Sequence, residues 1–155
     1  MASSIRNEQY QMLAELRYQI RLFLQSGDVT AQEVGIEPQQ YQLLLAIRGM
    51  PAKQQCTIRA LSERLLLKHH STVELIDRME TNQLVVRARD QKDRRQVFIR
   101  VQPKGEKLLN QIVQQRIEDL HTRGRTFINA LTALLDKNGK SGTKPRARQR
   151  PAGNH

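Results

Sequence analysis

The spacing of apolar residues changes between residues 57 and 101, from the period of a helix to the period of a β-strand. Thr57 offers a side-chain oxygen that can cap one helix. A second helix is expected to begin near residues 69–71, directly after the turn Leu66-Leu67-Lys68. Two helices joined by so short a turn must cross at a steep angle, so this segment predicts a helix-turn-helix.

Residues 85–101 then alternate between apolar and polar side chains, which is the pattern of half-buried strands. Two such runs, 85–89 and 97–101, are separated by the charged loop 90–95. A β-hairpin with a basic tip directly after a helix-turn-helix is a wing, and we use that name for residues 85–101. The helix before it is expected to face the core with four residues: Thr72, Leu75, Ile76 and Met79.

Helical periodicity flanks this segment on both sides. A first helix is predicted over about residues 5–25, ended by Ser26-Gly27-Asp28. Another is predicted over Gln39–Arg48, with Pro38 in its first turn. After the wing the helical pattern returns, and apolar stripes on either side of Gly124 predict two C-terminal helices.

The formal net charge of +11 is concentrated in two stretches. Between Val85 and Arg100 six basic residues oppose two acidic ones, and residues 137–155 hold six basic residues and no acidic one. These stretches carry +4 and +6, which leaves the rest of the chain nearly neutral. Focused cationic segments on a near-neutral body favour a polyanionic partner, with charge for solubility as the alternative.

These patterns predict a mostly α fold with a small β-hairpin wing, in which a winged helix-turn-helix is completed by N- and C-terminal dimerisation helices. Residues 1–136 are expected to form a single winged-helix domain. Its DNA-binding lobe would span about residues 37–102, and its dimerisation helices about 5–25 and 103–135. The terminal helices have little core of their own chain to cover, so we expect them to pair with a second copy. Residues 137–155 lack a hydrophobic anchor and predict a basic disordered tail.

Several other classes of protein find no support in the sequence. A single cysteine cannot form an intramolecular disulfide and fits a reducing compartment. No apolar run reaches the ~18–20 residues of a membrane span, and the start has no secretion-signal pattern, so a cytoplasmic protein is expected. No nucleophile triad, phosphate-binding loop or carboxylate pair stands out, and we expect neither an enzyme nor a cofactor.

His69-His70 and Cys56 are the residues that could suggest a metal or redox site. Adjacent histidines in a turn point apart, and no ligand partner lies at a suitable spacing, so no metal site is expected. Cys56 precedes a helix N-terminus, which can lower the pKa of a thiol. With no second cysteine to resolve an oxidised form, an incidental thiol is favoured over a redox sensor.

Four short blocks stand in a particular order along the chain. They are Gly35–Tyr41, Leu61–Leu65, Leu75–Glu80 with Leu84-Val85, and Asp93-Arg94-Arg95 followed by Val97, Gly105 and Leu108. With this order and spacing, the chain from about Ile5 to Leu135 resembles the MarR family of bacterial regulators. The resemblance implies a dimeric transcription regulator that binds double-stranded DNA.

The resemblance makes the helix after Lys68 the recognition helix, which would lie in the major groove, where each base pair presents a distinct pattern. Its side chains that do not face the core are the candidates for contact with DNA: Lys68, His69, His70, Ser71, Val73, Glu74, Asp77 and Arg78. Among these, Lys68 and Arg78 are suited to phosphates, which position the protein without specifying a sequence.

The wing supplies four further candidates: Lys92, Asp93, Arg94 and Arg95. Arg95 corresponds to the family arginine that enters the minor groove, where a narrow A·T-rich groove has enhanced negative potential. Asp93 would accept a hydrogen bond from this guanidinium and hold it extended. Lys92 and Arg94 would contact nearby phosphates.

The resemblance also implies control by a small, often aromatic or phenolic effector, bound where the dimerisation helices meet the DNA-binding lobe. The candidate residues, each of which has an ordinary core interpretation as well, are Met12, Leu16, Tyr18, Phe23 and Tyr41. The expected function is a ligand-responsive homodimeric repressor that binds an inverted-repeat operator. A nonspecific architectural DNA-binding protein and a protein-interaction module are the alternatives.

Overall fold

The computed structural model describes residues 5–136, which form helices around a single antiparallel hairpin. The elements follow in the order α1 (Asn7–Glu33), α2 (Pro38–Arg48), α3 (Ile58–Leu65), α4 (His69–Thr81), β1 (Val85–Arg89), β2 (Val97–Val101) and α5 (Pro103–Leu135). The mostly α fold with a β-hairpin wing is therefore confirmed. The predicted tail, 137–155, lies outside the described residues.

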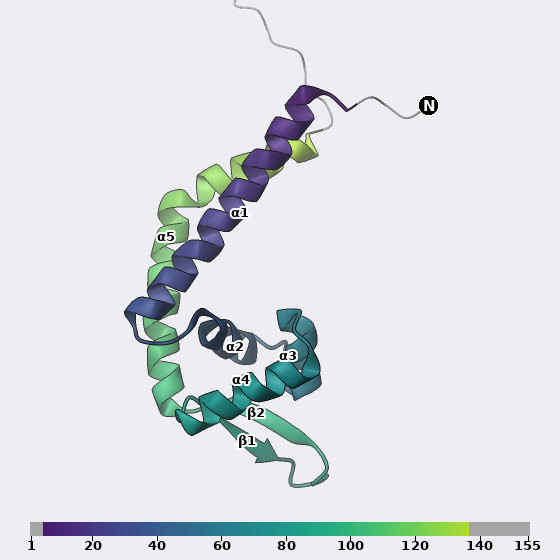
Figure 1. Cartoon of the computed structure of the whole chain (residues 1–155), viewed down its shortest axis with the longest axis vertical. Helices are drawn as coiled ribbons and strands as arrows, with labels where there is room; N and C mark the ends of the chain where they lie inside the picture. The colour runs from purple at the N-terminus through teal and green to yellow at the C-terminus, as the bar shows by residue number, and fades with distance from the viewer. Residues whose placement is uncertain (1–4, 137–155) are drawn as a thin grey trace, which may run out of the picture.

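The long helices α1 and α5 run side by side and rise away from the rest of the molecule (Figure 1). We call this pair the arm. The shorter helices α2, α3 and α4 pack together at its foot with the wing beside them, and we call them, with the wing, the reading lobe (Figure 1). Each local feature of the helix-turn-helix that the sequence predicted is present. Thr57 accepts a hydrogen bond from the Ala60 backbone N–H at 3.2 Å, and Pro38 occupies the first turn of α2.

The prediction that Ser26-Gly27-Asp28 ends the first helix is wrong, because α1 continues to Glu33. Gly27 is buried at the contact with α2 and α5, where a Cβ would lie 3.4 Å from Tyr41 Cε1 and 3.6 Å from Arg116 Nε. A glycine inside a helix costs only about 1 kcal/mol relative to alanine. Packing against two neighbouring helices outweighs that cost, so the glycine does not end the helix.

The expected pair of C-terminal helices is also a single element, since α5 runs unbroken through Gly124 and bends along its length (Figure 1). Nothing crowds this glycine: the nearest atom to an added Cβ would be Leu120 Cδ2 at 4.0 Å. The bend lets α5 follow α1 while its first turns stay against the reading lobe.

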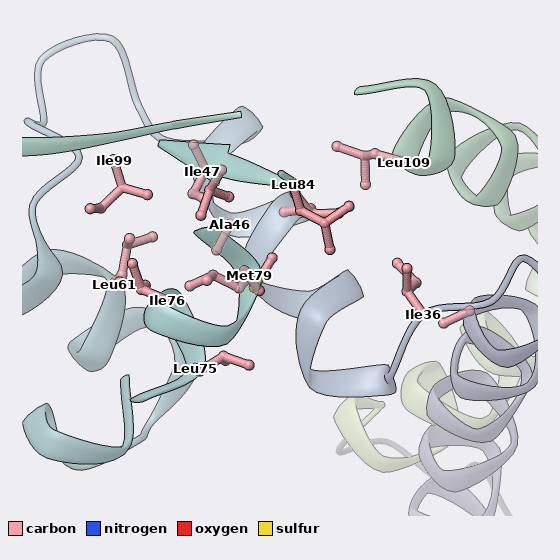
Figure 2. Close-up of a cluster of buried hydrophobic side chains, with 14 of the residues drawn as sticks. Ile36, Ala46, Ile47, Leu61, Leu75, Ile76, Met79, Leu84, Ile99 and Leu109 are labelled. Atoms are coloured by element: carbon pink, nitrogen blue, oxygen red, sulfur yellow. The ribbon is translucent and has the colours of Figure 1, made fainter. Parts of the chain in front are cut away.

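The hydrophobic core lies in the reading lobe and reaches into the foot of the arm. The four inward residues expected on α4, which are Thr72, Leu75, Ile76 and Met79, are all buried. Figure 2 shows Ile76 next to Leu61 of α3, with Ile99 of β2 in the same cluster. Ile36 and Leu109 extend the same cluster toward α1 and α5 (Figure 2). Because the inward face of α4 is buried in this core, the orientation of the helix and of its outward face is fixed.

The first turn of α5 passes unusually close to the start of the wing. A Cβ on Gly105 would lie 2.4 Å from the Leu84 carbonyl oxygen and about as close as contact allows to Val101 and Leu44, at 3.0 and 3.1 Å. The Gln102 backbone N–H donates to the same Leu84 carbonyl at 2.9 Å. Only a glycine fits this crossing of backbone against backbone.

We therefore predict that Gly105→Ala lowers the free energy of unfolding by about 2 kcal/mol or more, because an extra methyl group must displace backbone in a packed core. Gly124→Ala is the matched control on the same helix, and it should leave stability unchanged or raise it by up to about 1 kcal/mol. Urea denaturation at one fixed protein concentration measures both. Equal effects of the two substitutions would contradict the close-packing explanation.

Candidate nucleic-acid interface

Helix α4 presents a continuous outward face because its other face is sealed in the core. Of the predicted recognition residues, six are exposed and two, Ser71 and Val73, are half-buried. The exposed ones are Lys68, His69, His70, Glu74, Asp77 and Arg78. The structure thus gathers these candidates on the surface of one helix and the residue that precedes it.

The turn before α4 is closed by backbone hydrogen bonds. Leu66 adopts a left-handed conformation with φ of 55°, and the Leu67 N–H donates to the Ser62 carbonyl at 3.0 Å. The Lys68 carbonyl then accepts from both the backbone N–H and the hydroxyl of Thr72. These bonds fix the direction in which α4 leaves α3.

The wing tip is held by its aspartates, although not in the predicted way. Asp93 Oδ1 accepts from the backbone N–H of Arg95 at 3.0 Å, and Asp90 Oδ1 accepts from that of Lys92 at 2.9 Å. Among residues 5–136 no hydrogen bond joins Asp93 to the Arg95 guanidinium, and the aspartate side chain closes the turn on its own backbone. Across residues 5–136, no ion pair engages Lys92, Arg94 or Arg95, and all three are exposed.

A charged cluster joins α4 to β1. Arg87 Nη2 lies 2.6 Å from Asp77 Oδ1, and Arg87 Nη1 lies 2.5 Å from Glu80 Oε2. The Arg87 backbone N–H donates to Glu80 Oε1 at 3.0 Å, and this bond lowers the pKa of the Glu80 carboxyl against a smaller opposing effect of burial. Sequence reasoning missed the cluster, yet Asp77 and Glu80 stand three residues apart on one helix face, which was the available signal.

A buried arginine ties the two helices of the arm. The Arg116 guanidinium donates to the Phe23 carbonyl and to Asp119 Oδ2, both at 2.8 Å, and lies 4.7 Å from the centre of the Phe23 ring. Ser26 donates to the same Asp119 oxygen at 3.0 Å. The sequence hinted at this site, because Arg116 interrupts the apolar stripe of α5 one turn after Ile112.

Beside Arg116 lies a small cavity between α1 and α5 that is partly open to solvent. The rings of Phe23 and Phe127 face it, with their centres 6.4 Å apart. Of the predicted effector residues only Phe23 lines this cavity, while Tyr41 packs against Gly27 next to it. Met12, Leu16 and Tyr18 lie earlier on α1 and are not part of its lining.

Cys56 does not occupy the environment that its position before α3 suggested. The side chain is half-buried, and burial raises the pKa of the thiol, with a smaller opposing effect of a hydrogen bond from the Ile99 backbone. Burial therefore outweighs the lowering that a position before a helix N-terminus can cause. In the part of the chain that the structure describes, no three His, Cys, Asp or Glu side chains gather to hold a metal ion. Within residues 5–136, no helix combines the length and apolarity needed to cross a membrane.

Comparison with known proteins agrees with this architecture. Residues 34–96, which cover the helix-turn-helix and most of the wing, match the model of the MarR family. The chain is 30% identical over 122 residues to YsmB of Bacillus subtilis, an uncharacterized HTH-type transcriptional regulator, covering 79% of this chain and 82% of the relative.

Solved structures show the same fold. A MarR family protein from Bacillus stearothermophilus is 27% identical, with a TM-score of 0.67 over 85% of this chain and 96% of that one. A MepR mutant from S. aureus bound to an oligodeoxyribonucleotide is similar in fold, with 19% identity and a TM-score of 0.59 over 81% of this chain and 95% of that one. This chain belongs to the MarR family of winged helix-turn-helix transcription regulators, which bind DNA and are not enzymes.

Proposed function

We propose that this regulator is a ligand-responsive repressor that binds an inverted-repeat operator as a homodimer. The observation that carries the proposal is the shared exposure of two different DNA-reading elements on one lobe. The outward face of α4 suits the major groove, and the unpaired basic tip of the wing suits a flanking minor groove. The matched MepR structure holds an oligodeoxyribonucleotide, which supports the same use here.

The cations of the wing tip are proposed to make two kinds of contact, one with the shape of the minor groove and one with phosphates, and single substitutions can separate them. Arg95 has a fixed backbone and a side chain without an ion-pair partner among residues 5–136, so it is free to enter a narrow groove. Arg94 and Lys92, on the same exposed tip, are assigned to phosphates. A purely architectural protein would use all three cations alike, and would bind random duplex as well as a selected site.

The test begins with selection of an operator from a random DNA library, and we expect at least ~10³-fold preference over random duplex. Arg95→Ala should then weaken operator binding by about 1–3 kcal/mol and reduce the effect of flanking A·T to G·C changes. Arg94→Ala is the control, and it should weaken all duplexes alike. If wild type shows no preference for the selected site, the architectural alternative holds instead.

Dimerisation is proposed from the arm, whose outer surface is rich in exposed apolar side chains. On α5 these include Ile117, Ile128, Leu131 and Leu135, and on α1 they include Leu13, Ile20 and Leu24. A large exposed apolar surface on a single chain marks an interaction site. A second copy is the natural occupant, because two reading lobes are what an inverted repeat requires.

Replacing Leu131 and Leu135 together by Asp should therefore shift the protein from dimer to monomer at micromolar concentration, as measured by light scattering. Asn129→Asp with Thr132→Asp places the same charges off the apolar stripe of α5 and should leave the dimer intact. Wild-type protein that is monomeric under these conditions would rule out the proposed dimer.

We place the effector in the cavity between α1 and α5, where two aromatic rings and a buried arginine meet. A small aromatic or phenolic compound fits rings set this way, and its binding there would alter the packing that sets the angle of the arm. Phe127→Leu should reduce release of the operator by such a compound at least fivefold, because the ring contact is worth about 1 kcal/mol. Operator affinity without compound should stay unchanged, and Tyr18→Leu, outside the cavity, should leave the response intact. An equal loss in both variants would place the effector elsewhere.

A further inference from the structure

We propose that Asp77, Glu80 and Arg87 form a joint that sets the position of the wing relative to α4, and that Asp77 serves DNA binding through this joint instead of contacting a base. The inference rests on the proposed operator binding, in which α4 and the wing contact one DNA site together. It reassigns Asp77, which the sequence placed among the recognition residues, to a positioning role.

The contacts of the cluster are those of a fixed attachment. One guanidinium bridges two carboxylates one turn apart on α4, at 2.6 Å to Asp77 and 2.5 Å to Glu80. The Arg87 side chain is 27% exposed, against 52% for Arg78 and 86% for Arg59, whose ion pairs lie on the open surface. The Asp77 side chain is itself 58% exposed and that of Glu80 35%, so the partly buried side of the cluster is the Arg87–Glu80 contact. A partly buried guanidinium that donates to two carboxylates at once restricts orientation more than an exposed single pair does.

At the Arg87–Ile99 pair, the backbone of each strand also donates a hydrogen bond to a group outside the hairpin. Arg87 pairs with Ile99 across the two strands. The Arg87 N–H points away from the partner strand and donates to Glu80 Oε1 at 3.0 Å, while the Ile99 N–H donates to the Cys56 carbonyl at 2.9 Å. A two-stranded hairpin is only marginally stable alone. Carboxylate and carbonyl acceptors on either side therefore supply the anchorage that further strands would give in a larger sheet.

Between the Arg87–Ile99 pair and the tip, the hydrogen bonds of the described residues join the wing only to itself and not to the helices. About four residues separate Arg87 from the tip, a distance of roughly 13 Å at ~3.3 Å per residue. A tilt of about 10° at the joint would move the tip by roughly 2 Å on that lever. Such a displacement is enough to take Arg95 out of a minor groove while α4 stays in place.

Electrostatics gives the joint a distinctive signature. Asp77 is a negative charge on the face of α4 that would approach phosphates. Its removal alone should tighten DNA binding, because it weakens repulsion. If Asp77 instead holds Arg87 and the wing, its removal should weaken operator binding despite the favourable change in charge. A base contact would also weaken binding, but independently of Arg87.

A double-mutant cycle separates these cases. We would compare Asp77→Ala, Arg87→Lys and the double variant, with Glu63→Gln as control because it breaks the exposed Arg59–Glu63 pair away from the wing. Each joint variant should lose about tenfold in affinity for the selected operator, and the double variant should lose about the same, since one shared contact is broken. Affinity for random duplex should be unchanged or slightly higher for Asp77→Ala. Arg87→Lys keeps the charge, so it would bind normally if Arg87 only contacted phosphate.

Amide hydrogen exchange in the free protein measures how firmly the joint holds the wing when no DNA is present. Exchange in residues 88–98 should be faster in both single variants and unchanged in Glu63→Gln, while exchange in the α2–α4 core confirms that the lobe is folded. Three results would each overturn the proposed joint. They are a roughly hundredfold loss of operator affinity in the double variant, tighter operator binding by Asp77→Ala, and an unchanged exchange rate in the wing. Wild type that does not discriminate between operator and random duplex would defeat the proposed function instead, and the exchange result would still decide whether the joint exists.

Discussion

The crossing of Gly105 over the Leu84 carbonyl is the contact on which the rest of the architecture depends. At this point the exit of α4, the first strand of the wing and the first turn of α5 meet within contact distance. The absence of a side chain lets the backbone of α5 reach the base of the wing, and Gln102 adds a side-chain hydrogen bond to the Val85 carbonyl at 2.9 Å. A movement of the arm at this point would therefore be passed to the wing and to the surface proposed to face DNA.

Two arginines, Arg116 buried and Arg87 partly buried, then hold two further contacts between elements. Arg116 ties α5 to the backbone of α1, and Arg87 ties the wing to α4. Arg116 joins two helices and Arg87 joins a strand to a helix, and the directional hydrogen bonds of each arginine add to the apolar contacts between those elements. An effector beside Arg116 would alter the contact between α1 and α5. A resulting shift of α5 would reach the wing through the contact of Gly105 with Leu84.

The sequence was sufficient for features whose cause is local. The period-two alternation predicted both strands, Thr57 and Pro38 marked helix starts, and the inward face of α4 followed from its spacing. Prediction from the sequence failed where contacts with a segment distant in the sequence determine the local structure. Gly27 looks like a helix end until its packing against α2 and α5 is known, and Asp77 looks free until Arg87 is brought beside it. The raised pKa of Cys56 likewise depends on burial against the wing, which the position before α3 does not reveal.

The central claim is that one lobe reads two grooves at once, and that a dimer presents two such lobes. Chemical footprinting of the selected operator tests this most directly. Two protected major-groove segments are expected, about one helical turn or a multiple of it apart and related by the symmetry of the repeat. Minor-groove protection should flank them on the outer sides and should disappear in Arg95→Ala while the major-groove protection remains. A single uninterrupted protected stretch, or minor-groove protection that survives in Arg95→Ala, would contradict the account.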